Sequence, residues 1–196
     1  MRVSKERAAQ NRERILISAA RLFREHGIAA TGVDSITQDA GLTHGGLYSH
    51  FGSKEAIAAE AIRFALARGQ RVWQRAIERN PGKRALPAIV DSYLSAAHRD
   101  APGTGCVVAA LGTDIARQPR RVRQAFTEEI KDDLEFLSRL MANSDRSCDY
   151  EDAIVAFAAM IGALILARAV DDKVLSDLIL KSTAKRVIKR ARKKTA

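Results

Sequence analysis

Two short helical patterns flank a glycine in residues 33–51, which read VDSITQDAGLTHGGLYSHF. Apolar residues recur in the first pattern at spacings of three and four: Val33, Ile36 and Ala40. Gly41 ends this pattern, because glycine readily adopts the positive φ found just past a helix end. Thr43 suits the N-cap of a second helix, whose inward residues are Leu47 and Phe51. Two helices joined by such a turn predict a helix-turn-helix, whose second helix can enter the major groove of DNA.

The residues in and around this segment follow the pattern of a known family. They are Thr31, Val33, Ile36, Ala40, Gly41, Leu42, Thr43, Gly45, Leu47, Tyr48, His50, Phe51, Ser53, Lys54 and Glu55. With the apolar helix before them, they resemble the DNA-binding signature of the tetracycline-repressor (TetR) family. The resemblance implies an all-α protein of about nine helices. It further implies a helix-turn-helix DNA-binding domain of three helices at residues 1–53 and a helical effector-binding and dimerisation domain at residues 54–196.

The resemblance also implies roles for individual residues of the DNA-binding domain. Phosphate contacts fall to Thr31, Thr43, Tyr48, His50 and Lys54, and the positions facing base edges are His44, Gly45 and Gly46. Hydroxyl, phenol, imidazole and ammonium groups and a helix N-terminus all bind phosphate oxygens. The outward side of the second helix has no Arg or Lys for bidentate reading of guanine. Its adjacent glycines, Gly45 and Gly46, have two explanations. They let the backbone approach DNA closely, or the helix has diverged from the family pattern and specifies the DNA sequence only weakly.

The net charge of +10 is concentrated at the C-terminal end of the chain. Residues 181–196 carry eight Lys and Arg residues and no acid, whereas residues 1–55 carry eight basic and six acidic residues. The total charge therefore does not identify the DNA-binding end. The basic tail either attracts phosphates without sequence preference or is a solvated helix end whose cations suit the helix dipole.

Composition and missing motifs restrict the class of protein. The sequence has no run of about 18 uninterrupted apolar residues and no apolar leader near Met1. Its two cysteines, Cys106 and Cys148, have no paired spacing and suit a reducing cytosol. We therefore expect a cytoplasmic protein that does not associate with membranes. Paired carboxylates, Ser/His/Asp sets, metal-ligand spacings and Gly-rich phosphate motifs are not found, so we expect no enzyme activity, cofactor or metal.

Helical periodicity extends along the whole chain. We expect helices at residues 9–26, 33–40, 43–50, 54–79, 85–99, 106–118, 119–140 and 150–170, and a last one from 171. Residues 1–8 are expected to be a disordered arm and residues 143–149 a loop. The helix at 150–170 is apolar nearly all round, which is typical of a helix buried on most sides. Since one chain is too small to cover it, we expect a homodimer through helices 150–170 and 171–190; the resemblance implies a four-helix interface there.

Apolar and aromatic side chains provide candidates for an effector pocket: Trp73, Tyr93, Cys106, Phe126 and Phe157. Core packing explains the aromatic ones equally well, and His26 and His98 read as structural histidines. Cys106 stands at an expected helix N-terminus, where the dipole favours a thiolate. Its segment is similar to one in a branch of the family that includes electrophile- and oxidant-responsive repressors. The alternative is an inert, buried thiol.

These features predict a homodimeric transcriptional regulator. The resemblance implies a repressor that binds double-stranded DNA at a palindromic operator, one half-site per subunit. It also implies a small-molecule effector that changes the separation of the two DNA-binding domains. Two alternatives remain: an effector-independent activator or non-specific DNA-binding protein, and a helical small-molecule carrier or enzyme.

Overall fold

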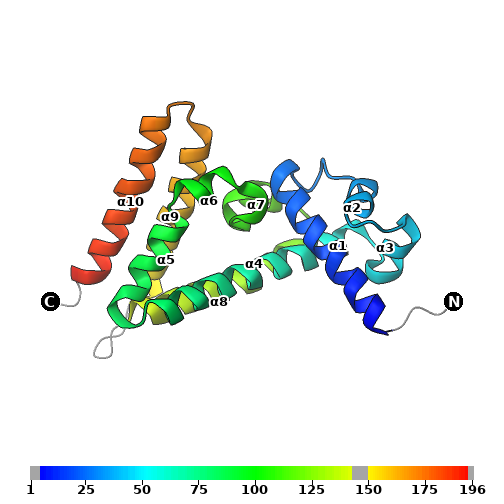
Figure 1. The fold of residues 1–196 in the computed structure, drawn as a ribbon, viewed down its shortest axis with the longest axis horizontal. Helices are drawn as coiled ribbons and strands as arrows, with labels where there is room; N and C mark the ends of the chain where they lie inside the picture. The colour runs from blue at the N-terminus through cyan, green and yellow to red at the C-terminus, as the bar shows by residue number, and fades with distance from the viewer. Residues whose placement is uncertain (1–4, 143–149, 194–196) are drawn as a thin grey trace. The chain divides into compact units, whose positions relative to one another are not determined.

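The computed structural model describes residues 5–142 and 150–193 (Figure 1). These residues form α-helices and two short 3₁₀ helices, so the all-α prediction is confirmed. The α-helices are α1 (Lys5–His26), α2 (Val33–Asp39), α3 (His44–Phe51), α4 (Lys54–Arg79), α5 (Ala85–Tyr93), α6 (Ala96–Asp100), α7 (Val107–Ile115), α8 (Arg120–Met141), α9 (Tyr150–Ala169) and α10 (Lys173–Lys193). The 3₁₀ helices are η1 (Gly82–Arg84) and η2 (Pro102–Thr104).

The chain divides into two compact units. Unit 1 comprises the described residues up to Arg68 together with Cys106–Glu129, and unit 2 comprises Gly69–Gly105 together with the described residues from Ile130 onward. Unit 1 therefore continues past residue 53 into α4 and also takes in α7 and the start of α8. The domain boundary expected between residues 53 and 54 separates a DNA-binding from an effector-binding function. The division into compact units does not test it, so it stays a prediction.

Unit 1 is built around one apolar core. Helix α1 contributes Ile15, Ala19 and Phe23, which recur every fourth residue and are almost fully buried. The side chains they meet come from each of the other helices of the unit: Ile36, Leu47, Ile57, Ile62, Leu111, Ile115 and Val122. Each large side chain buried in this way contributes about 1.5–3 kcal/mol of transfer free energy. The two short helices α2 and α3, which bury few residues of their own, depend on this core for their stability.

Unit 2 contains an antiparallel pair of long helices, α9 and α10, which lie side by side (Figure 1). At one end the Ser176 hydroxyl donates to the Ala167 carbonyl at 2.6 Å. At the other end Arg190 binds the buried Asp152 carboxylate at 2.8 Å. Asp172 caps α10 by accepting from the amides of Val174 and Leu175, as expected for an acid at a helix start.

One described helix, α9, has the length and apolar composition of a membrane span. Buried core helices of soluble proteins pass the same test, and 44% of the apolar window of α9 is buried inside the fold. Its long contact with α10 and its contacts with α6 contribute to that burial. Helix α9 therefore packs into the fold with one side and leaves its other side exposed.

Several predicted boundaries are wrong by a few residues. Helix α1 begins at Lys5, so the expected disordered arm is helical at residues 5–8, and the rest of that arm lies outside the described residues. The helix expected at 85–99 is broken into α5 and α6, because Leu94 leaves the helical region and Ser95 starts a new helix by accepting from the His98 amide. This break raises the expected number of helices from nine to the ten described. The loop expected at residues 143–149 lies outside the described residues.

Candidate nucleic-acid interface

The turn between α2 and α3 is a Schellman motif. Gly41 has a φ of +61°, in the left-handed region that favours glycine. Its amide donates to the Gln38 carbonyl at 3.0 Å, and the Leu42 amide donates to the Thr37 carbonyl at 2.8 Å. These bonds satisfy the last carbonyls of α2 and redirect the chain within two residues. The turn predicted at Gly41 is confirmed, and it fixes the angle between α2 and α3.

Helix α3 has one buried side and one exposed side. Leu47 and Phe51 are buried in the core of unit 1, as the spacing of four predicted. His44, Gly45, Tyr48 and Ser49 are exposed. The exposed side carries an imidazole, a phenol and a hydroxyl around the N-terminal half of a short helix. Such groups bind the phosphates and base edges of a nucleic acid.

Arg12 of α1 contacts the buried side of α3. Its guanidinium carbon lies 4.8 Å from the centroid of the Phe51 ring, within cation–π range. The same guanidinium forms an ion pair with Glu60 of α4. One side chain thereby joins α1, α3 and α4, so α3 is held by a cation as well as by apolar packing.

Three of the predicted phosphate-binding residues lie at the start and end of α3 and at the start of α4. Thr43 is the exposed N-cap of α3, and its side chain makes no capping hydrogen bond. His50 is half-buried beside Phe51, at a ring distance of 6.3 Å. Lys54 opens α4 and donates to the Ala29 carbonyl at 3.1 Å. Ser53 caps α4 as expected, by accepting from the Ala56 amide.

Thr31 differs from the other predicted contacts because it is buried, with 3% of its surface exposed. Its hydroxyl lies 2.7 Å from the Gly27 carbonyl oxygen and 3.3 Å from that of Leu22. It therefore closes the C-terminal end of α1. A phosphate contact by Thr31 would require its hydroxyl to leave these carbonyls.

The two glycines of α3 have different surroundings. A Cβ added to Gly45 would meet no heavy atom within 4 Å, so nothing inside the protein requires a glycine there. A Cβ added to Gly46 would lie 3.4 Å from the Thr43 hydroxyl oxygen. The fold thus tolerates a side chain at Gly45, so packing inside the protein does not explain the glycine.

Asp34 is a residue that sequence reasoning did not connect to the interface. Its carboxylate binds Nδ1 of His44 at 2.6 Å, and both side chains are exposed. On the other side, the His44 ring lies 5.0 Å from the Tyr48 ring. The sequence carries no signal for the Asp34 contact, because it depends on the angle that the Gly41 turn sets between α2 and α3.

The predicted effector-pocket residues fall into both units. In unit 2, the Trp73 ring lies 6.4 Å from the Phe157 ring and 5.8 Å from the Phe136 ring. Tyr93 is buried and packs edge-on against His98, at 4.8 Å. Such direct ring contacts also describe ordinary core packing.

Unit 1 contains the other two effector-pocket candidates. Phe126 is half-buried against the core. Cys106 is half-buried at the N-cap of α7, as its sequence position predicted. Burial lowers the pKa of the neighbouring Arg24 to about 10, and attraction to the Cys106 thiolate partly opposes this shift. Cys148 lies outside the described residues.

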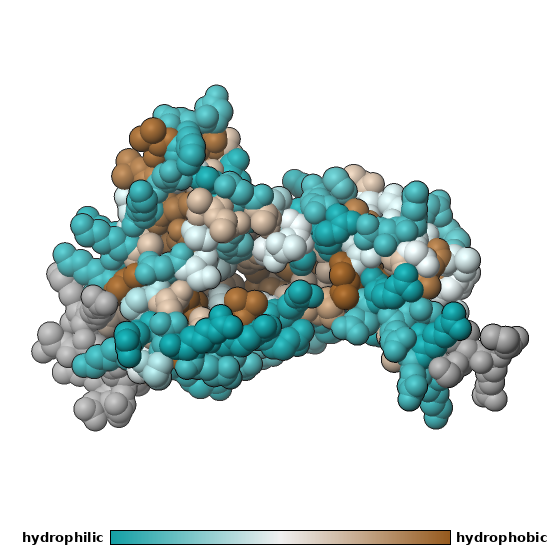
Figure 2. Space-filling view, in the orientation of Figure 1, coloured by the Kyte–Doolittle hydropathy of each residue, from teal (hydrophilic) through white to brown (hydrophobic). Residues whose placement is uncertain are grey.

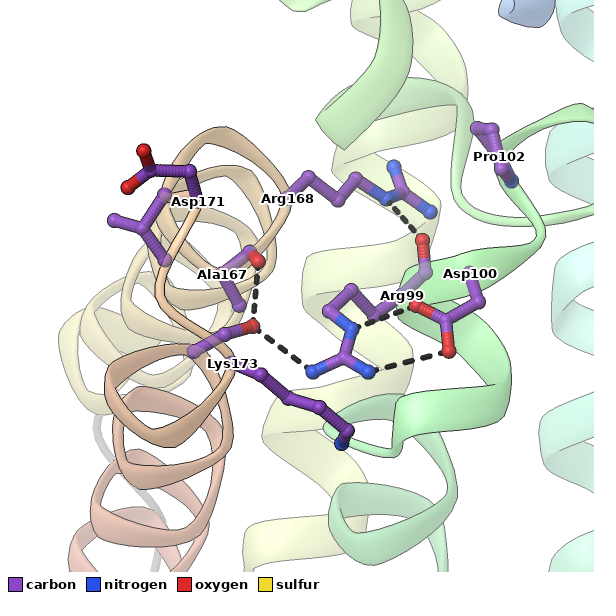
Figure 3. Close-up of a pocket in the computed structure, with 9 residues that line it drawn as sticks. Arg99, Asp100, Pro102, Ala167, Arg168, Asp171 and Lys173 are labelled. Carbon is purple, nitrogen blue, oxygen red and sulfur yellow. Dashed lines mark hydrogen bonds and ion pairs between the residues drawn. The ribbon is translucent and has the colours of Figure 1, made fainter.

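A surface pocket of about 430 Å³ lies in unit 2, where α6 meets the turn between α9 and α10 (Figure 3). Arg99 donates to Asp100, Ser176 and Asp177 at 2.7–2.9 Å. These bonds raise the pKa of Arg99 and lower the pKa of both carboxyl groups. Arg168 donates to the backbone carbonyls of His98 and Arg99. Arg99 and Arg168 thus join α6 to the α9–α10 turn, and in this structure both cations have a structural role.

Comparison with known proteins agrees with the helix-turn-helix geometry. Residues 15–61, which include α2, α3 and the turn between them, match the family model described as bacterial regulatory proteins, tetR family. The chain is 28% identical over 185 residues to the uncharacterized HTH-type transcriptional regulator Rv0196 of Mycobacterium tuberculosis, covering 86% of this chain and 89% of the relative. It is 32% identical over 97 residues to the HTH-type transcriptional repressor KstR2 of Mycolicibacterium smegmatis, covering 47% and 46%.

The fold itself matches that of solved regulators. A TetR-family transcriptional regulator from Cytophaga hutchinsonii superposes with a TM-score of 0.78 at 22% identity, covering 96% of both chains. That likeness concerns the fold, whereas the family match covers the helices that form the interface. The chain belongs to the TetR family of bacterial regulatory proteins and is a DNA-binding helix-turn-helix transcriptional regulator.

Proposed function

We propose that the protein is a homodimeric repressor that inserts α3 into each half of a palindromic operator and leaves it when an effector binds. The observation that carries this proposal is the two-sided character of α3. Its inner side is fixed by Leu47, Phe51 and Arg12, while its outer side presents polar groups. A rigid helix with a polar exposed side suits the major groove of DNA.

The DNA-contacting groups divide into two classes by position. Thr43 is the N-cap of α3, Tyr48 and His50 lie within it and Lys54 opens α4; in this proposal these four side chains bind phosphates, which orients the helix. His44 and the backbone at Gly45 and Gly46 face the base edges. Since α3 has no Arg or Lys, affinity depends on phosphate contacts and on DNA shape more than on bidentate base contacts.

Substitution of Tyr48 and Lys54 tests this assignment. The double variant Tyr48→Ala/Lys54→Ala should lose operator binding while remaining folded and of unchanged oligomeric state. The control is Lys83→Ala/Lys131→Ala, which removes two exposed cations from unit 2 outside the proposed dimer helices α9 and α10. Operator affinity, measured by fluorescence anisotropy, should be unchanged in the control. Equal affinity of both variants would refute the assignment of α3 as the contact surface.

The dimer is proposed from an apolar surface on unit 2. Figure 2 shows apolar side chains gathered over the α9–α10 hairpin. The exposed apolar residues of these two helices are Ile154, Val155, Ile165, Leu166, Val174, Leu175 and Leu178, which are 41–79% exposed. Large exposed apolar surfaces on soluble proteins mark interaction sites. Pairing of this surface with a second copy gives a two-fold dimer, and a two-fold dimer requires a palindromic site.

Repression and release are proposed from the family. The relative KstR2 carries the description repressor. An effector bound by unit 2 releases DNA only if its affinity differs between the DNA-competent and incompetent states. A coupling of about 1–3 kcal/mol would weaken operator binding by roughly 5–150-fold. A thermal-shift screen of small molecules, followed by operator release, tests this step, with Trp73 and Phe157 as the first residues to substitute. The setting is the cytoplasm, and no catalytic activity is proposed.

A further inference from the structure

Asp34 of α2 and His44 of α3 form a bridge on the exposed side of the helix-turn-helix. The Asp34 carboxylate oxygen lies 2.6 Å from Nδ1 of His44. The Asp34 side chain is 90% exposed and that of His44 is 55% exposed. We propose that Asp34 is a specificity-determining positioning residue, which selects the base that His44 contacts. This inference rests on the proposed binding of α3 to DNA.

The chemistry of the two groups fixes the position of a proton. An ionised carboxylate can only accept hydrogen bonds, so the hydrogen in this bond belongs to Nδ1 of His44. In a neutral imidazole with the proton on Nδ1, Nε2 carries a lone pair and is an acceptor. Asp34 therefore determines that the outward nitrogen of His44 accepts a hydrogen bond.

A second contact restricts the orientation of the same ring. Tyr48 stands one turn further along α3, and its ring centroid lies 5.0 Å from that of His44, with 41° between the planes. The ring is thus contacted by a carboxylate from α2 and by a phenol ring from α3. Helix α1 packs against both α2 and α3, and its Arg14 guanidinium lies against Gly41 in the turn. The His44 ring is consequently oriented before DNA arrives.

An oriented acceptor distinguishes bases in the major groove. Adenine offers its N6 amino group and cytosine its N4 amino group as donors, whereas guanine and thymine present acceptors at the corresponding positions. A lone pair on Nε2 matches the first two bases and repels the others. His44 should therefore favour adenine or cytosine at the base that it contacts, and this preference should depend on Asp34.

The tautomer can be tested without DNA. The ¹⁵N shifts of the His44 ring, recorded at a pH where the imidazole is neutral, should show protonated Nδ1 in the wild type. Asp34→Ala should shift the proton towards Nε2, the tautomer preferred by a histidine side chain in water. Asp39→Ala is the matched control, because Asp39 is also exposed on α2 but pairs with Arg21. The same tautomer in the wild type and in Asp34→Ala would overturn the proposal.

Base preference provides the second test. The affinity of the wild type and of His44→Ala is measured for half-sites with single base-pair substitutions. The base pair at which His44→Ala loses discrimination is the one that His44 contacts. Asp34→Ala should lower discrimination at that same base pair by about tenfold. Asp34→Ala/His44→Ala should lose no more than His44→Ala alone, and Asp39→Ala should keep the wild-type preference. Because Asp34 is exposed, the thermal stability of Asp34→Ala should match that of Asp39→Ala.

The outcomes separate this inference from the proposed function. Wild-type discrimination in Asp34→Ala, or additive losses in the double variant, would overturn the role of Asp34 while α3 remained the DNA-binding helix. If the wild-type protein binds all duplexes with equal affinity, the proposed function is overturned. The recognition of a base by His44 is then overturned with it. The ring-nitrogen shifts would then still show whether the pairing of Asp34 with His44 is correct.

Discussion

The carboxylate of Asp114 in α7 accepts a hydrogen bond from the backbone amide of Ile28, at 2.6 Å and across 86 residues of chain. Ile28 is buried immediately after Gly27, whose φ of +85° takes the chain out of α1. Asp114 therefore satisfies an amide that would otherwise be buried without a bond. Through this contact α7 holds the loop that leads from α1 into α2.

Loss of the Asp114 carboxylate should destabilise unit 1. Asp114→Ala leaves the Ile28 amide without an acceptor, and we expect the free energy of unfolding to fall by about 1.5–3 kcal/mol. Urea denaturation followed by circular dichroism measures this change. Asp114→Asn keeps an acceptor oxygen and should lose less than half as much. An Asp114→Ala protein as stable as the wild type would show that the bond contributes nothing.

The stability of unit 2 should fall in mild acid because of His98. Its Nδ1 donates to the Tyr93 carbonyl at 2.7 Å. Burial lowers the pKa of His98 from its ordinary value of 6.5, the bond to Tyr93 opposes this shift, and the charge of Arg168 adds to it. The unfolded chain therefore takes up a proton near pH 6.5 that the folded chain takes up only at lower pH. The stabilisation is complete above pH 6.5 and is lost as the pH falls through the folded pKa.

Thermal unfolding from pH 8 to pH 5 measures this effect. His98→Asn should reduce the dependence of the melting temperature on pH below 6.5, because its side chain does not titrate. His26→Asn is the control, since His26 is exposed on α1. An unchanged pH profile in His98→Asn would contradict the assignment.

Replacement of Gly45 tests whether the backbone of α3 approaches DNA closely. A Cβ at this position meets nothing inside the protein, and alanine is favoured over glycine in a helix by about 1 kcal/mol. Gly45→Ala should therefore stabilise the fold but weaken operator binding. Gly69→Ala in α4, where an added Cβ is equally uncontacted, should give a stability gain alone. Undiminished operator affinity in Gly45→Ala would favour the drifted, weakly specifying helix.

Charges placed on the α9–α10 surface should dissociate the proposed dimer. Val174 and Leu178 are 79% and 57% exposed, one turn apart on α10. Val174→Glu/Leu178→Glu should give a folded monomer by light scattering, because burial of unpaired carboxylates in an apolar interface is unfavourable. Val72→Glu in α4 alters another exposed apolar residue of unit 2 and should leave the dimer intact. A dimeric double variant would place the interface elsewhere.

Local sequence patterns predicted most of the helices and the exposed side of α3. The bounds of α4, Lys54–Arg79, coincide with the prediction, because Ser53 caps its start and Asn80 with Pro81 ends it. The Gly41 turn followed from glycine's freedom at positive φ. The break at Ser95 was missed because serine is compatible with both a helix interior and an N-cap.

Contacts between distant residues were not accessible to the same reasoning. The bonds Asp34–His44 and Ile28–Asp114 depend on where separate helices lie in space. Thr31 illustrates the same dependence on packing: family resemblance implies a phosphate contact, which stays a prediction, while the fold buries its hydroxyl against two carbonyls. Residue type and spacing identify which groups are chemically suited to a site, but packing decides which of them are exposed.

The most direct test of the account is a hydroxyl-radical footprint of the protein bound to DNA sequences that it has selected from random duplexes. The dimer predicts two protected patches on one palindrome, a whole number of helical turns apart, that persist at moderate salt and disappear with Tyr48→Ala/Lys54→Ala. Uniform protection of any duplex, lost steeply as salt increases, would mark a non-specific DNA-binding protein and contradict the account.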